Sequence, residues 1–133
     1  MSSVQTHSEN YDRGLENRRA VLGSEHVDRS LEKVSEFSRP IQELVTEYCW
    51  GAVWGRDALD RKTRSLLNLG LLTALNRSHE LAVHVRGAVN NGVTVAEIQE
   101  TLLQCAVYVG VPAALESFRV AEAVLGELGY DLS

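Results

Sequence analysis

Apolar residues in this chain recur at intervals of three and four positions, and alternation at every second position is nearly absent. Val27, Leu31 and Val34 form one such series, and Leu81 and Val85 belong to another. This spacing places side chains on one face of an α-helix, whereas a strand requires a period of two. The sequence therefore predicts an all-α fold, a single-domain helical bundle of about six to seven helices.

Residues that start or stop helices punctuate the chain. Thr94 and Glu97 give the clearest signal, because a capping box satisfies free amides at a helix start. Ser38, Asp60 and Ser78 are also expected to accept hydrogen bonds from such amides. The predicted helices cover residues 11–22, 24–34, 38 into the glycine-broken stretch 48–55, 61–72, 78–90, 94–106 and 112–128. Helix 61–72 is apolar nearly all round, and we expect it to be the buried centre.

The length of the chain sets its domain count. At 133 residues it fits one compact domain with a modest core. The first ten residues are polar and show no pattern. We therefore expect a flexible tail over residues 1–10 and one helical domain over residues 11–133.

Charge and hydropathy exclude several classes of partner. The formal net charge is -5, so the broad cationic surface that binds nucleic acid is missing. The longest apolar stretch, Leu66 to Leu75, is too short to span a bilayer. No basic segment followed by an apolar run opens the chain. These features favour a cytoplasmic protein that binds neither nucleic acid nor a membrane.

Cysteine and histidine spacing argues against a metal or dithiol centre. Cys49 and Cys105 are far apart and belong to no CxxC or Cys/His cluster, so both are expected to be small buried residues. The histidines around Glu80 lack the HExxH arrangement and a third ligand at a defined spacing. We therefore expect no metal.

Glu80 and His84 are the polar residues that best fit a catalytic pair. At positions i and i+4 they lie on one face of a helix, and His84 stands among apolar residues, where burial would tune its proton affinity. Such a pair can move a proton. The alternative, which the residues alone favour, is a core histidine hydrogen-bonded to Glu80 only to satisfy both groups.

Two arginines and two tryptophans are further candidates. Arg77 precedes a helix start and can form an anion site with free amides there, or it is a solvated loop residue. Arg64 lies in a first helical turn, where a cation is unfavourable unless an anion is near. Trp50 and Trp54 are candidates for pocket walls that exclude water, with core or subunit contacts as the usual role of large aromatics.

The order of these features is itself informative. The chain resembles the gamma-carboxymuconolactone decarboxylase family, within the alkylhydroperoxidase-like superfamily, and the resemblance covers nearly everything after the tail. It rests on Arg18 to Gly23, Tyr48 to Gly51 with Trp54, Thr63 to Leu67, Ala74 to Arg77 with Glu80, His84 and Arg86, Asn90 to Thr94 with Glu97 and Ile98, Leu102 to Gln104, and Tyr108 with Gly110 to Ala114.

One departure within that superfamily bears on the chemistry. Its alkylhydroperoxidases carry CxxC followed four residues later by His, and Arg77, Glu80 and His84 occupy the corresponding positions here. Because both thiols are replaced, a peroxidase cycle through neighbouring thiols cannot operate at that site. The resemblance then favours decarboxylation.

The resemblance implies conversion of 4-carboxymuconolactone to the enol-lactone of 3-oxoadipate, a step in protocatechuate catabolism by the beta-ketoadipate pathway. No cofactor is needed, because the substrate's ring takes up the electrons. We expect His84 to deliver a proton or stabilise the enolate oxygen and Glu80 to orient it. Arg64 and Arg77 would bind substrate carboxylates.

Trp50 and Trp54 would then form an apolar wall beside the leaving carboxylate. The family also implies a homo-oligomer, such as a hexamer, whose partner is a small dicarboxylate lactone. Two other functions stay open: a thiol-dependent peroxidase, and a non-catalytic helical oligomer that binds small acids.

Overall fold

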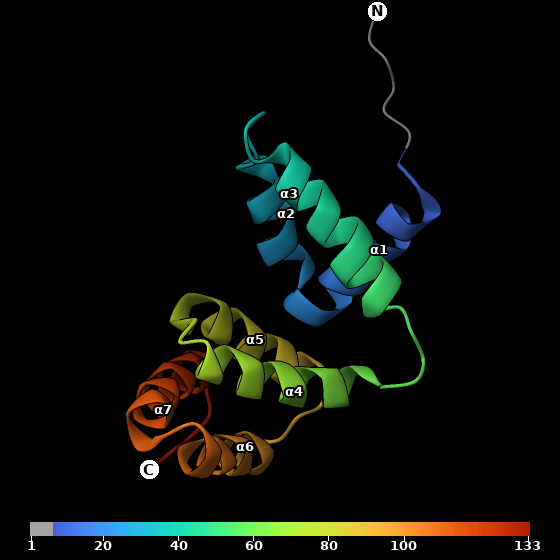
Figure 1. Cartoon of the computed structure of the whole chain (residues 1–133). Helices are drawn as coiled ribbons and strands as arrows, with labels where there is room; N and C mark the ends of the chain where they lie inside the picture. The colour runs from blue at the N-terminus through green and yellow to red at the C-terminus, as the bar shows by residue number, and fades with distance from the viewer. Residues whose placement is uncertain (1–6) are drawn as a thin grey trace, which may run out of the picture. The chain divides into compact units, whose positions relative to one another are not determined.

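The computed structural model describes residues 7–133, and all its regular elements are helical, which confirms the predicted all-α class. The chain forms two compact units, one that ends at Leu59 and one that begins at Asp60. The predicted single domain over residues 11–133 stays a prediction. The elements are α1 (Glu9–Leu22), α2 (Ser24–Glu32), α3 (Arg39–Leu44), η1 (Val45–Val53), α4 (Arg61–Ala74), α5 (Ser78–Asn90), α6 (Val95–Tyr108) and α7 (Val111–Glu127) (Figure 1).

The first helix begins two residues earlier than expected. Residues 1–6 of the predicted tail lie outside the described residues. Ser8 has an extended backbone, and its hydroxyl accepts a hydrogen bond from the Tyr11 amide at 3.1 Å. It therefore caps α1, which starts at Glu9.

The first unit is built on very close packing of α1 against η1. A Cβ at Gly14 would lie less than 3.0 Å from the Thr46 carbonyl oxygen, and a Cβ at Gly51 would meet the Asn10 carbonyl in the same way. Only glycine permits this approach of two backbones. Val21, Trp50 and Trp54 form a small buried core.

The third predicted helix contains a feature that its sequence pattern did not predict. α3 runs directly into η1, a π-helix, and the Trp54 amide donates to the Cys49 carbonyl at 2.9 Å. The helical run ends at Val53, inside the expected stretch. Ser38 does not cap it, contrary to expectation, because the Ser38 hydroxyl accepts instead from the Ser35 amide at 2.9 Å.

The second unit is a four-helix bundle in which the helices contact one another in a closed series. α4 packs on α5, α5 on α7, α7 on α6, and α6 on α4. Leu69 from α4, Leu81 and Val85 from α5, and Ile98 and Leu102 from α6 are almost fully buried in its core. This packing gives α5 a rigid setting.

Two of the three helix caps predicted in this unit are confirmed. The Asp60 carboxylate accepts from the Thr63 amide at 2.7 Å, and both bonds of the Thr94/Glu97 capping box are present. Ser78 is not a cap: it is the first residue of α5, and Arg77 occupies the cap position without a side-chain bond. The Arg77 amide instead donates to the Leu72 carbonyl at 2.9 Å, which ends α4 and starts α5 in one tight turn.

The expectation that helix 61–72 is the buried centre is wrong for the single chain. Leu69 is fully buried, but Leu67, Leu71 and Leu75 stand about half exposed on one side of α4. Its buried side includes Thr73, whose hydroxyl accepts from Ser117 on α7 at 2.9 Å. The helix therefore has two apolar faces. One is covered by the other helices of the bundle, and the other is exposed in the single chain.

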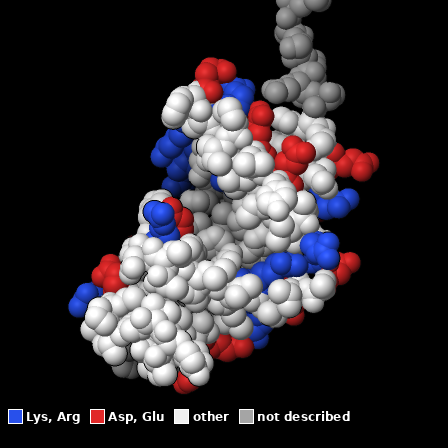
Figure 2. Space-filling view, in the orientation of Figure 1, with Lys and Arg blue, Asp and Glu red and all other residues white. Residues whose placement is uncertain are grey.

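Lys and Arg side chains lie among Asp and Glu side chains on the face shown in Figure 2. The absence of a nucleic-acid partner stays a prediction. Among the described helices, none has the length and apolar character needed to cross a bilayer.

Candidate active site

Glu80 and His84 lie on α5 as predicted, one turn apart near its start. Glu80 is exposed in the first turn, where the helix dipole favours a carboxylate. His84 is half-buried, between the almost fully buried Leu81 and Val85. The pair thus joins a solvent-facing carboxylate to an imidazole held against the core of the second unit.

The surroundings of His84 alter its proton affinity in two opposite ways. Burial lowers the pKa of His84 below its ordinary value of 6.5, and the Glu80 carboxylate raises this pKa by a smaller amount. Its Nδ1 atom is shielded from solvent. At neutral pH the imidazole of the free protein is therefore mostly neutral and ready to accept a proton.

The two predicted carboxylate-binding arginines occupy different positions. Arg77 is exposed at the turn before α5, and among the described residues no carboxylate lies within 4.0 Å of its guanidinium. Arg64 is half-buried in the first turns of α4, where its amide donates to the Asp60 carbonyl at 3.1 Å. Both belong to the same unit as Glu80 and His84.

Trp50 and Trp54 are brought together in the first unit. Their rings stack with centroids 4.6 Å apart and planes 27° apart, and both are buried. The Asn17 side-chain amide donates to the Trp50 carbonyl at 2.9 Å, which ties η1 to α1. The two tryptophans thus belong to the buried core of the first unit, and their placement in one site with His84 stays a prediction.

The thiols are in environments that suppress reactivity. Cys49 and Cys105 are both unbridged, and they lie in different units. Burial raises the pKa of each thiol. The thiolate, which is the reactive form, is therefore disfavoured at both positions.

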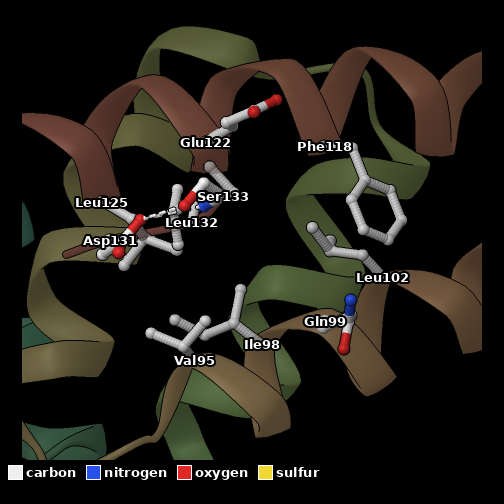
Figure 3. A pocket seen from close by; sticks show the side chains of 11 residues that line it. Val95, Ile98, Gln99, Leu102, Phe118, Glu122, Leu125, Asp131, Leu132 and Ser133 are labelled. Carbon is white, nitrogen blue, oxygen red and sulfur yellow. Dashed lines mark hydrogen bonds between the residues drawn. The ribbon is translucent and has the colours of Figure 1, made fainter.

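In the described part of the chain, each of three cavities lies within a single unit and has neither Glu80 nor His84 in its wall. The expected hollow beside this pair stays a prediction. The cavity in Figure 3, about 410 Å³ in volume, is bounded by α6, α7 and the C-terminal residues. Ile98, Leu102 and Phe118 face into it, and Asp131 accepts a hydrogen bond from the Ser133 hydroxyl at 2.6 Å at its margin. The sequence does not reveal this cavity, because the spacing of its apolar lining residues is the same as that of core residues.

Metal ligands do not gather in the described part of the chain. No group of three His, Cys, Asp or Glu side chains in residues 7–133 is placed to hold an ion. The proton chemistry of the Glu80–His84 pair is available without one.

Comparisons with known proteins place these features in a family. Residues 39–123 match the carboxymuconolactone decarboxylase family. The chain is 46% identical over 124 residues to the nitrosuccinic acid decarboxylase of Metarhizium robertsii, covering 93% of this chain and 87% of that one. It is 44% identical over 119 residues to the 4-carboxymuconolactone decarboxylase of Acinetobacter baylyi, covering 90% and 89%. The chain belongs to the carboxymuconolactone decarboxylase family.

Proposed function

We propose that this decarboxylase acts without a cofactor on a small organic acid that carries its own electron sink, with 4-carboxymuconolactone as the first candidate. The observation that carries the proposal is the Glu80–His84 pair: a half-buried imidazole with a lowered pKa, one turn from an exposed carboxylate. Such a pair can supply the one proton that the reaction consumes. The family likeness supports the type of reaction.

The chemistry of this substrate explains what the protein has to do. When the ring carboxylate leaves as carbon dioxide, the electron pair of the broken carbon–carbon bond moves through the conjugated double bond to the lactone carbonyl. An aromatic furan-olate results, and protonation on carbon gives the enol-lactone. The protein has to hold the acid, stabilise the oxyanion and deliver a proton.

His84 is the proposed proton donor, and Glu80 is the proposed positioning residue. Because Glu80 is exposed and His84 half-buried, the carboxylate can orient the imidazole and link it to solvent for reprotonation. Arg64 and Arg77 are proposed to bind the carboxylates, and Trp50 and Trp54 to line the apolar side. An anionic substrate beside His84 would raise its pKa and favour the imidazolium.

Nitrosuccinic acid is a second candidate substrate, because one of the similar proteins is named for its decarboxylation. Its nitro group can accept the electron pair released with carbon dioxide, which forms a nitronate that is then protonated on carbon. The demand on His84 is the same in both reactions. The two substrates differ in the shape of the group that accepts the electron pair, a lactone ring in one and a nitro group in the other. The residues that bind the retained carboxylate should therefore select between them.

Carbon dioxide release by the purified protein tests the proposal directly. We expect release from 4-carboxymuconolactone, with nitrosuccinate as the parallel assay. Release from nitrosuccinate alone would reassign the substrate, and release from neither would favour a non-catalytic protein that binds small acids. Peroxide consumption that depends on Cys49 or Cys105 would instead support the peroxidase alternative.

We also propose that the chain works as a cytoplasmic homo-oligomer. The uncovered side of α4 carries Leu67, Leu71 and Leu75, and α6 exposes Val107 and Tyr108. A groove of about 490 Å³ between these helices is lined mainly by apolar side chains. Surfaces of this kind usually mark a protein contact. The molar mass in solution, measured by light scattering, will give the number of subunits.

The lowered pKa of His84 predicts an acid-shifted activity profile. If the imidazolium donates the proton, kcat/KM should be highest below the His84 pKa and fall about tenfold for each pH unit above it. Since Glu80 raises this pKa, Glu80→Gln should move the break to lower pH. Initial rates from pH 5 to 8 for both proteins provide the check. A flat profile would assign the proton to another group.

Removal of either proposed carboxylate-binding arginine should weaken substrate binding. For Arg77→Ala and Arg64→Ala we expect KM to rise about tenfold or more, because hydrogen bonds to a charged group are lost. Arg29→Ala is the control, since Arg29 is exposed and forms an ion pair with Glu25 on its own helix. A KM equal to that of the unmodified protein would remove the arginine concerned from the site.

A further inference from the structure

Arg18 on α1 is a buried cation that the proposed chemistry does not use. Its side chain lies in the first unit and the residue is only 7% exposed. One guanidinium nitrogen donates to the side-chain oxygen of Gln42 at 3.1 Å and to the Thr46 hydroxyl at 3.2 Å. Among the described residues no carboxylate lies within 4.0 Å, and its Nε atom has no hydrogen-bond partner.

The next residue shows how an arginine in this helix is ordinarily satisfied. Arg19 donates two hydrogen bonds to the Asp28 carboxylate, at 3.1 and 2.7 Å, while remaining partly exposed. Arg18 is more deeply buried and has neutral acceptors only. Burial lowers the pKa of Arg18, although an arginine stays protonated in a protein. A buried charge without a counter-ion is destabilising, so this guanidinium is a strong site for an anion.

A small cavity adjoins Gln42, one of the two residues that hold Arg18. It has a volume of about 200 Å³ and is lined by His7, Tyr11, Leu31, Val34, Arg39, Gln42 and Glu43. Gln42 is shared, because its side-chain oxygen accepts from Arg18 while the residue lines the cavity. Tyr11 is also near enough to Arg18 to raise the pKa of its guanidinium.

One of the hydrogen-bond acceptors around Arg18, the side-chain oxygen of Gln42, could be replaced by a ligand. Thr46 donates its hydroxyl proton to the Gln42 backbone carbonyl at 2.8 Å, so its lone pairs remain for Arg18. The Gln42 side-chain amide is held to Arg18 by a bond between a charge and a neutral oxygen. A carboxylate would make a stronger, charge-assisted bond in its place.

We propose that Arg18 binds a small carboxylate anion that enters this cavity and replaces the Gln42 side-chain oxygen at the guanidinium. Leu31 and Val34 would cover the carbon chain of the ligand, which suits an organic acid better than a strongly hydrated inorganic anion. The site lies within the first unit and uses none of the residues proposed for decarboxylation. It is therefore an additional ligand site, independent of the proposed function.

Succinate is a suitable probe, and calorimetric titration with parallel melting curves tests the site. We expect succinate to bind the unmodified protein and raise its Tm, and Arg18→Met to weaken binding about tenfold or more. Arg29→Met is the control for loss of a surface charge. Arg29→Met should bind succinate as the unmodified protein does. Succinate binding that Arg77→Ala abolishes would belong to the proposed decarboxylation site and not to Arg18.

Two further measurements separate a ligand site from a purely structural arginine. Without ligand, Arg18→Met should melt at or above the temperature of the unmodified protein, because an uncompensated charge has been removed. Gln42→Leu should bind succinate more tightly, because the competing oxygen is gone. If Arg18→Met fails to fold, Arg18→Lys keeps the charge but not the planar fork, and should show weakened binding.

Several results would overturn the assignment. One is the absence of succinate binding to the unmodified protein at millimolar concentration, and another is unchanged affinity in Arg18→Met or Arg18→Lys. A response to inorganic phosphate but not to succinate would refute the carboxylate class. Weaker succinate binding by Gln42→Leu would refute the exchange. None of these results depends on whether the protein releases carbon dioxide.

Discussion

Replacement of His84 by alanine should lower kcat for carbon dioxide release about a hundred- to ten-thousand-fold, which is the usual contribution of a positioned proton donor. The substrate would still lose carbon dioxide slowly, because its own ring stabilises the electron pair. KM should change little, since the arginines are expected to supply most of the binding. His79→Ala is the matched control, because His79 is exposed and lies before His84 on the same helix.

The stability of the His84→Ala protein shows whether a loss of activity is chemical. His84 is only half-buried, so we expect a loss of about 1–2 kcal/mol, with α5 still held by Leu81 and Val85. The folded protein binds the His84 proton less readily than the unfolded chain, whose imidazole keeps the ordinary pKa of 6.5. Stability should therefore fall as the pH drops below 6.5, and the variant should lose this part of the acid sensitivity.

Turnover near that of the unmodified protein, in a folded His84→Ala sample, would assign the proton to another group. A low activity that His79→Ala shares would point to damage to α5 as a whole. The melting temperature and the far-UV circular dichroism spectrum of both variants distinguish these cases from the expected one.

Local side-chain chemistry made much of the fold predictable from the sequence. The Thr94/Glu97 capping box and the Asp60 cap were predicted correctly, because each needs only residues three positions apart. The caps predicted at Ser38 and Ser78 rested on the same kind of local signal and were wrong. Ser38 bonds with Ser35, and the turn before α5 leaves its cap position to Arg77. Competing local partners decide such positions, and composition does not reveal which one prevails.

Features that depend on packing between distant segments were harder to predict. The sequence indicated the Glu80–His84 pair, because both lie on one helix. The buried state of Arg18 depends instead on Gln42 and Thr46, more than twenty positions away, and an arginine is ordinarily assumed to be solvated. The π-helix η1 likewise lies in very close contact with α1, which is a distant segment. The spacing of apolar residues in η1 is that of an ordinary α-helix and does not predict it.

Substitution of alanine for Gly14 should destabilise the protein by about 3 kcal/mol or more and lower the Tm by about 10 °C or more. In an ordinary helix the same change is stabilising, because alanine is the better helix former. Here the new methyl group would lie less than 3.0 Å from the Thr46 carbonyl oxygen and 2.8 Å from the Gly51 amide nitrogen. Both are backbone atoms, so relief requires α1 and η1 to move apart.

Gly126→Ala is the control, since nothing lies within 4 Å of a Cβ added at that exposed position in α7. It should raise the stability by about 0.5–1 kcal/mol. Chemical unfolding curves for both variants will show whether the free energy of unfolding falls in Gly14→Ala and rises in Gly126→Ala. Gly51→Ala should resemble Gly14→Ala, because its methyl group would meet the Asn10 carbonyl across the same contact. A Gly14→Ala protein as stable as Gly126→Ala would mean that α1 and η1 pack less closely than described, and that the Trp50–Trp54 wall has a looser support.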